Sequence, residues 1–276
     1  MVNRENPERV VINTETLKET QQRIRKILEW CRDYLRQNYP NLVIDDSLRI
    51  DPAKFITIIN KNEIDQDLNE VSEREQQFQE KKPIGIDFSS GEVLEIYKTA
   101  LLNKILSQDY VIVRTSKYDD YFNGVDNIIL DKNTGEVIAA IDDIADTMSQ
   151  RFITKKKNII NRNLNKGGVI KYGLSIDKES KEIIITKYLE GIPIIYIALD
   201  EKHLYKLVEQ FDNPEIENKF IEFVINLIQL IISEIDLKKN LVKGIDQEEI
   251  NKRLENLKRL VKSLEQRQKE LSGRQK

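Results

Sequence analysis

Residues 118–143 read YDDYFNGVDNIILDKNTGEVIAAIDD, and this stretch decides the fold. Two apolar runs, VDNIIL at 125–130 and EVIAAID at 136–142, flank the turn sequence KNTG. Short apolar runs on either side of a turn that contains glycine predict a β-hairpin. Each run carries an aspartate near its outer end, Asp126 in the first and Asp142 in the second. The predicted hairpin therefore places two carboxylates at its open end.

The length of the loop decides whether these two carboxylates face each other. A three-residue loop of Asn133, Thr134 and Gly135, with Gly135 in the left-handed conformation, places Asp126 directly opposite Asp142. Opposed Cβ atoms lie about 5 Å apart. Carboxylates that close repel each other unless a proton or a cation lies between them. A four-residue loop would instead place Asp126 opposite Ile141, and both registers remain open.

The sequence around the hairpin predicts an α/β fold with a mixed sheet. Ser89 and Glu92 have the spacing of a capping box and start a predicted helix. A helix, three strands, a helix and further strands then follow one another, which is typical of α/β proteins. The predicted elements are a helix at 90–106, a strand at 109–115, the hairpin, a helix at about 147–165, and strands at 169–176, 182–189 and 192–199.

Two helical regions flank this core. Residues 1–83 contain a predicted helix at 14–38 and an acidic, Gln-rich stretch that we interpret as a mobile helix or linker. Residues 84–200 form the α/β core, and residues 201–276 form a helical C-terminal region. That region ends in a coiled-coil seam, which predicts either a homodimer or packing against the apolar helix at 220–235. The seam residues are Ile250, Leu254, Leu257, Val261 and Leu264.

The core resembles the PD-(D/E)xK nuclease superfamily over roughly residues 84–199. Asp126 in NGVDNIIL and Asp142 in EVIAAIDD match the two acids of its motif, within the same helix–strand–strand–strand–helix–strand order. The resemblance implies a restriction-endonuclease-like mixed sheet flanked by helices. It also implies that Asp126 and Asp142 bind Mg²⁺, or Mn²⁺ in its place, with Glu95 or Glu92 from the preceding helix as a further ligand.

The sequence departs from the family pattern at the motif lysine. The family has a lysine two residues after the second acid, where this chain has Ile144, or Ala145 if Asp143 is taken as the second acid. At about 100° per residue, Lys156 falls near the centre of an apolar arc on the following helix, so we expect it to replace the motif lysine. Lys155, Arg162 and Lys166 are expected to contact the nucleic-acid backbone. The arc consists of Met148, Phe152, Ile153, Ile159, Ile160 and Leu164.

Composition excludes several other classes of protein. The 276 residues are 39% hydrophobic and 33% charged, and a net charge of −3 gives no overall positive field. Cys31 is the only cysteine and His203 the only histidine, so a zinc cluster of these residue types is excluded. A lone cysteine suits a reducing cytosol, and we expect a cytoplasmic protein. The apolar run at 220–235 is too short for the ~20 residues of a membrane span, so no membrane partner is expected.

Three hypotheses follow from these patterns. The first is a Mg²⁺-dependent nuclease that hydrolyses phosphodiester bonds. The second is a catalytically inactive nuclease-like protein that binds nucleic acid or serves as an assembly module, which Ile144 favours. The third is a structural α/β protein whose helical ends dimerise, without affinity for metal or nucleic acid. In all three, Asp119 and Asp120 are interpreted as turn residues.

Overall fold

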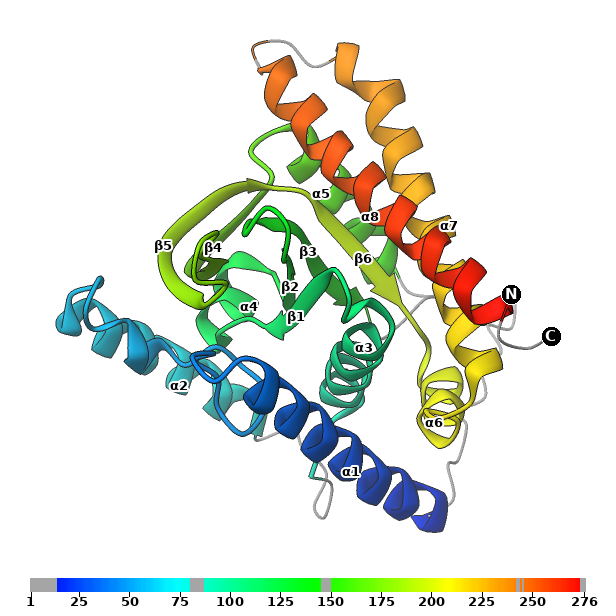
Figure 1. Ribbon diagram of the computed structural model, residues 1–276. Coiled ribbons are helices and arrows are strands. Elements are labelled where there is room, and N and C mark those ends of the chain that lie inside the picture. Colours follow the sequence, from blue (N-terminus) through cyan, green and yellow to red (C-terminus); the bar gives the residue numbers. More distant parts are fainter. Residues whose placement is uncertain (1–13, 80–86, 145–149, 242–243, 245, 274–276) are drawn as a thin grey trace, which may run out of the picture.

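The computed structural model describes residues 14–79, 87–144, 150–241, 244 and 246–273, and it confirms an α/β fold with a mixed sheet (Figure 1). The main sheet has four strands in the order β1-β2-β3-β6. β2 runs antiparallel to both β1 and β3, whereas β6 runs parallel to β3. A separate hairpin is formed by β4 and β5. The strands are β1 Tyr110–Arg114, β2 Asn127–Asp131, β3 Val137–Ile144, β4 Gly168–Ile176, β5 Ile183–Ile192 and β6 Ile194–Ala198.

Helix α3 (Ser90–Leu106) occupies the centre of the molecule. It begins at the predicted capping box, in which the N–H of Ser89 donates to the Glu92 carboxylate at 2.8 Å and the N–H of Glu92 donates to the Ser89 hydroxyl at 3.3 Å. Most of its side chains are buried, including those of Lys98 and Asn103. A helix that is buried on nearly all sides needs neighbours on several faces. α1 (Thr14–Asn38) packs on one side of α3 and β1 packs on another.

The β2–β3 hairpin combines the two registers that the sequence leaves open. The turn spans four residues, because the Asp131 N–H donates to the Glu136 carbonyl and Leu130 pairs with Val137. A bulge between Ile129 and Leu130 then shifts the pairing by one residue. From the pairing of Ile129 with Ala139 to that of Asn127 with Ile141, the strands have the register expected for a three-residue loop. Asp126 precedes β2, and its N–H donates to the Ile141 carbonyl. The bulge is an extra residue on β3 that no inspection of loop length reveals.

The acidic segment after residue 60 is a helix that packs on the core, which differs from the mobile element predicted for it. α2 (Lys61–Gln79) contacts α4 (Lys117–Asn123), and Ile64 and Val71 are buried on the contact side. Between them Asp67 is also buried, and it accepts a hydrogen bond from the Tyr172 hydroxyl at 2.5 Å. The helix is one of the two predicted alternatives, a mobile helix or a linker, and the buried charge in the middle of the stripe weakens the apolar pattern that would have predicted its packing on the core. Residues 80–83 of that prediction lie outside the described residues.

The C-terminal seam is buried within the chain, so the homodimer predicted as one alternative has no exposed seam to use. α8 (Gln247–Gly273) packs against α7 (Pro214–Lys238), and its seam residues are almost completely inaccessible to solvent. The other alternative, packing back on the apolar helix, is the one observed (Figure 1). α6 (Glu201–Glu209) and the short 3-10 turns η1 (Pro52–Phe55) and η2 (Lys239–Leu241) complete the fold. None of the helices described is long and apolar enough to cross a membrane.

Shortening a side chain of the seam should destabilise the folded monomer. Leu257 is 0% exposed, so Leu257→Ala is expected to lower the free energy of unfolding by about 2–5 kcal/mol because it leaves a cavity between α8 and its neighbours. Leu237→Ala is the matched control, since Leu237 is 78% exposed and should lose little. Urea unfolding at two protein concentrations measures both. Equal losses in the two variants, or a concentration-dependent midpoint, would contradict an intramolecular seam.

Candidate metal centre

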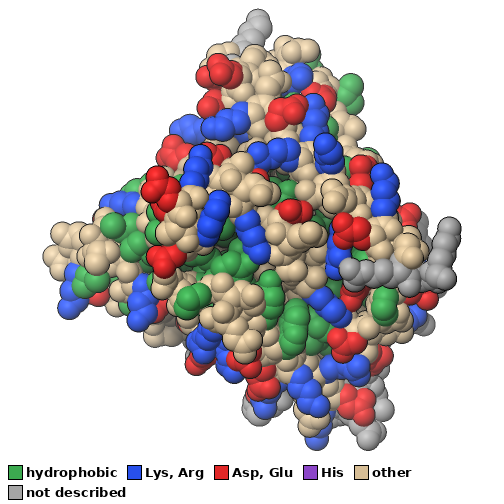
Figure 2. Space-filling model, in the orientation of Figure 1, with side chains coloured by type: hydrophobic (Ala, Val, Ile, Leu, Met, Phe, Trp, Pro, Cys, Tyr) green, Lys and Arg blue, Asp and Glu red, His purple; other side chains and the backbone are tan. Residues whose placement is uncertain are grey.

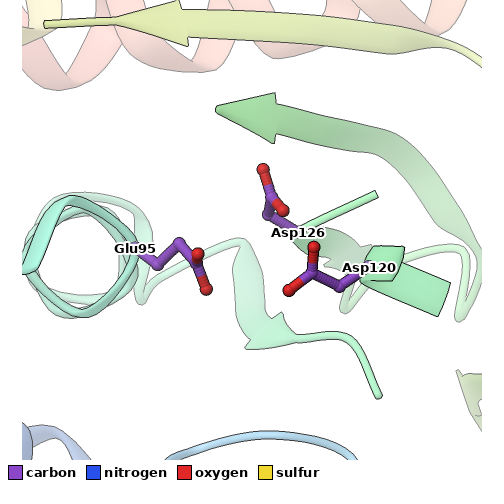
Figure 3. A group of neighbouring side chains, drawn as sticks. All are labelled: Glu95, Asp120 and Asp126. Atoms are coloured by element: carbon purple, nitrogen blue, oxygen red, sulfur yellow. The ribbon is translucent and has the colours of Figure 1, made fainter. Parts of the chain in front are cut away.

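Three carboxylates from three different elements converge at one end of the strands of the main sheet. Glu95 projects from α3, Asp120 from α4, and Asp126 from the residue before β2 (Figure 3). One oxygen of each carboxylate lies within 4.8 Å of the others. The side chains of Glu95 and Asp120 are only 12% and 16% exposed, and Asp126 is buried. The group has the residue types and the spacing of an oxygen-rich cation site.

Asp120 is the member that the sequence prediction missed. It lies on α4, a short helix where the sequence predicts a turn, so that interpretation of Asp119 and Asp120 was wrong. The Ser116 hydroxyl caps the first turn by accepting the Asp119 N–H, and Gly124, with φ of 58°, ends the helix in the left-handed conformation. Ser before the first turn and Gly after the last are helix signals that are present in the sequence.

Asp119 has a structural role that fits its burial. Its carboxylate accepts hydrogen bonds from the backbone N–H groups of Lys171 and Tyr172, at 2.7 and 3.2 Å, and from Ser116 and Asn123. These bonds tie α4 to β4. Asp119 therefore fixes the helix that carries Asp120.

The two aspartates of β3 lie beside the group of three. Asp142 is not part of that group, and it forms an ion pair with Lys155 of α5 (Gln150–Leu164). Asp143 forms an ion pair with the fully buried Lys98 of α3, and its N–H donates to the Asp126 carboxylate. The second carboxylate oxygen of Asp143 is buried without a hydrogen-bond partner among the described residues. Native structures seldom leave such an oxygen without a partner, so a donor or a cation other than the described side chains would complete it.

Lys155, and not Lys156, is the lysine that reaches the carboxylates. Its ammonium group pairs with Asp142 and donates to the Asp143 carbonyl at 2.5 Å. Lys156 points the other way and pairs with Glu234 of α7 at 2.9 Å, so the structure places it away from the centre. Ile159, Ile160 and Leu164 of the predicted apolar arc are buried, whereas Ile153 is 58% exposed. The arc therefore describes most of the buried face of α5 but does not identify the lysine that reaches the carboxylates. The start of that predicted helix, with Met148, lies outside the described residues.

The remaining predicted residues fall in different places. Glu92 caps α3 and is thereby engaged away from the group of three. Arg162 is half-buried and donates to the carbonyls of Asn123 and Gly124, at 2.7 and 3.1 Å, where it holds the end of α4. Lys166 is exposed at the end of α5.

Two arginines that the sequence prediction did not single out neutralise part of the acidic charge. Arg49 Nη2 lies 2.6 Å from Glu95 Oε2 and 3.0 Å from Asp120 Oδ2. Arg114 of β1 also bonds Glu95. Both arginines are buried. Burial opposes ionisation of Glu95, but Arg114 and Arg49 outweigh it and hold the pKa of Glu95 at about 2.

The other carboxyl groups have raised pKa values. Burial, followed by the charge of Asp126, raises the pKa of Asp120 well above its usual range and that of Asp142 to about 6. Burial also raises the pKa of Asp143 to about 7, against the opposing effect of Lys98. Burial acts to lower the pKa of Lys155, but Asp142 and Asp126 raise it above its usual value. Burial and the charge of Asp126 thus favour the neutral forms of these three carboxyl groups.

The free energy of unfolding of the metal-free protein should decrease as the pH rises from 5 to 8. Asp142 and Asp143 have folded pKa values of about 6 and 7, above the unfolded value of about 3.9, so the folded chain binds more protons in this range. A pKa difference of one corresponds to about 1.4 kcal/mol, so we expect a loss of at least about 1 kcal/mol. Glu95 has a depressed pKa, so its ionisation changes the free energy of unfolding only below about pH 5.

Urea unfolding in a chelator at pH 5 and pH 8 measures this loss. The Asp143→Asn variant should show a flatter dependence on pH, because its side chain cannot titrate. A wild-type stability that rises with pH would show that these carboxyls are not held in their neutral form.

Comparison with known proteins gives no relative for this chain. No protein-family model, curated protein or solved structure matches it.

Proposed function

We propose that this chain is a divalent-metal-dependent nuclease with a restriction-endonuclease-like core. The observation that carries the proposal is the convergence of Glu95, Asp120 and Asp126 beside the Lys155–Asp142 pair. The order α3-β1-β2-β3-α5-β6 supports it, with α4 inserted between β1 and β2 and the β4–β5 hairpin between α5 and β6. The acids come from α3, from α4, from the start of β2 and from β3. Function is argued here from the site, since the order of elements alone does not fix it.

The residues present fit a hard divalent cation. Mg²⁺ and Mn²⁺ prefer carboxylate oxygens, and Asp126 with Asp120 and Glu95 would hold the ion. Burial, with the nearby charge of Asp126, raises the pKa values of Asp120, Asp142 and Asp143, and a bound cation would favour their ionised forms. When bound, such an ion polarises a phosphoryl oxygen and lowers the pKa of a bound water.

The side chains beside the site would supply the rest of the chemistry. Lys155 keeps its proton because its pKa is raised, so its role is to stabilise negative charge on the phosphate. Asp142, with a pKa of about 6, is suited to accept a proton from the attacking water near neutral pH. These roles replace the one expected for Lys156.

Contacts to nucleic acid would be local. Lys and Arg side chains are interspersed with Asp and Glu over the face drawn in Figure 2. Arg162 is engaged within the protein, which leaves the exposed Arg151, Lys157 and Lys166, on α5 or just after it, as groups that can meet phosphates of a bound strand outside the centre. Such contacts position a strand without reading its sequence.

A cleavage assay tests the proposed function. The full chain is incubated with single- and double-stranded DNA and RNA in Mg²⁺, in Mn²⁺ and in EDTA. We expect shortened products of at least one substrate in the metal arms and none in EDTA. Intact substrates in every arm, with a folded protein, would contradict nuclease activity.

A second candidate is a nucleic-acid-binding protein that does not cleave. The observation in its favour is that Arg49 and Arg114 already neutralise Glu95. It predicts equal binding of an oligonucleotide in Mg²⁺ and in EDTA, whereas the nuclease should bind more tightly with the metal.

A further inference from the structure

Arg49 occupies the position that a cation would take between two carboxylates of the centre. A single nitrogen, Nη2, bonds both Glu95 and Asp120, and these belong to the group whose oxygens lie within 4.8 Å of one another. Glu95 lies 46 residues further along the chain, so this contact joins the N-terminal region to the core. A metal ion and the Arg49 guanidinium would therefore compete for the same oxygens.

The backbone of Arg49 is fixed by hydrogen bonds to other parts of the chain, whereas its head group is held mainly by the two carboxylates of the centre. The Arg49 N–H donates to the Asp45 carboxylate at 2.8 Å, and the next residue, Ile50, donates to the Arg114 carbonyl at 3.0 Å. Leu48 precedes it with φ of 65°, a conformation that is costly for a leucine and that the surrounding packing enforces. The only described bond of the head group besides those to the carboxylates is a long one, 3.4 Å from Nη1 to the Thr115 carbonyl.

The charges of the centre favour an exchange. Five carboxylates face four directly paired cations, which leaves one negative charge at full ionisation. Withdrawal of Arg49 would leave two, which is the charge that one divalent ion neutralises. The carboxylates are Glu95, Asp120, Asp126, Asp142 and Asp143, and the cations are Arg49, Arg114, Lys98 and Lys155.

A cavity gives the guanidinium somewhere to go. It has a volume of about 280 Å³ and is lined by Arg49 and Lys117 together with the carboxylates of Asp45, Asp51 and Glu75, among others. Asp45 and Asp51 accept backbone N–H groups, and Glu75 pairs with Lys117. A phosphate group that enters would meet the Arg49 guanidinium and would compete with Glu75 for Lys117. Arginine binds phosphate oxygens in the same forked geometry with which it binds carboxylates.

We propose that Arg49 is an exchangeable cation of the centre, which leaves Glu95 and Asp120 for a phosphate of the nucleic-acid strand when a divalent ion binds. The proposal rests on the proposed function and adds a coupling to it. The metal ion would take Glu95 and Asp120 from Arg49, and the phosphate of the strand would take Arg49 from these carboxylates. Each ligand should therefore tighten the binding of the other by the same factor.

Calorimetric titration with Mn²⁺ tests the exchange on the full-length protein. We expect Arg49→Met to bind Mn²⁺ about ten-fold more tightly than the wild type, a factor within the usual range of such couplings. Arg36→Met is the matched control, because Arg36 is 49% exposed, pairs with Asp46 and carries the same charge, and it should bind Mn²⁺ like the wild type.

A second arm adds a short single-stranded oligonucleotide with Ca²⁺ as the titrated ion. The strand should tighten ion binding to the wild type and have no such effect in Arg49→Met. Tighter ion binding in Arg49→Met together with lost coupling supports the exchange. An Arg49→Met variant that binds Mn²⁺ no more tightly than the wild type overturns it, while the nuclease proposal stands on the wild-type binding. Absence of binding in both proteins overturns both proposals.

A measurement on the unmodified chain covers the case in which Arg49→Met does not fold. In protein labelled with ¹⁵N-arginine, Mg²⁺ should shift the side-chain resonance that is missing from Arg49→Lys. An Arg49 resonance that stays unchanged at saturating Mg²⁺ overturns the exchange.

Discussion

Asp126→Asn is expected to remove metal-dependent cleavage while the chain stays folded. Asp126 belongs to the group of three carboxylates, and the loss of its charge should cost several kcal/mol of transition-state stabilisation, or about 10³-fold in rate. The fold should survive because an asparagine oxygen can still accept the Asp143 N–H. The Asp126 charge is one cause of the raised pKa values of Asp120, Asp142 and Asp143, so it opposes their ionisation. Without that charge, the free energy of unfolding of the metal-free protein should stay unchanged or rise.

The two opposite effects make this variant informative. A variant that merely misfolds loses activity and stability together, whereas Asp126→Asn should lose only activity. Asp212→Asn provides the control for the change in charge, since Asp212 is 84% exposed and pairs with Lys104 away from the centre. Initial cleavage rates and urea midpoints are measured on the same preparations. Cleavage by Asp126→Asn at the wild-type rate would remove the group of three from the mechanism.

Lys155→Met should reduce the cleavage rate by about 10²–10³-fold, the effect of removing one group that stabilises developing charge. Lys155 is the ammonium group paired with Asp142. Metal affinity should be kept or should rise, because Lys155 is a cation of the centre and not a ligand. Its removal leaves Asp142 without its ion-pair partner, so the pKa of Asp142 should rise above about 6.

Lys156→Met is the natural control, since the neighbouring lysine pairs with Glu234 on the far side of α5. A half-exposed ion pair of this kind is worth about 0–1 kcal/mol, so its loss should leave rate and stability nearly unchanged. Lys155→Arg should recover part of the rate by keeping the charge. Equal losses in Lys155→Met and Lys156→Met would contradict the assignment of Lys155.

The strands and the central helix could be predicted from sequence because their signals are local. The capping box at Ser89 fixed the start of α3, and the apolar runs fixed β1, β2, β3 and β6. The resemblance to the PD-(D/E)xK superfamily predicted Glu95 or Glu92 beside Asp126, and the structure brings Glu95 and Asp126 together.

The rest of the centre depends on contacts that no local pattern contains. Lys155 and Lys156 differ by about 100° around one helix, and an analysis centred on apolar residues selects the wrong one when the neighbouring site is polar. Asp120 was assigned to a turn although Ser116 and Gly124 mark a helix there. Arg49 comes from a segment without clear periodicity, and only the folded chain shows that it reaches Glu95.

A crystal soaked in Mn²⁺ and measured at the manganese absorption edge tests the central claim most directly. The account predicts an anomalous peak at ligand distance, about 2.0–2.4 Å, from Asp126 and from Asp120 or Glu95, with the Arg49 head group moved away. A fully soaked crystal without a peak at these carboxylates, and with Arg49 still on Glu95 and Asp120, would contradict it.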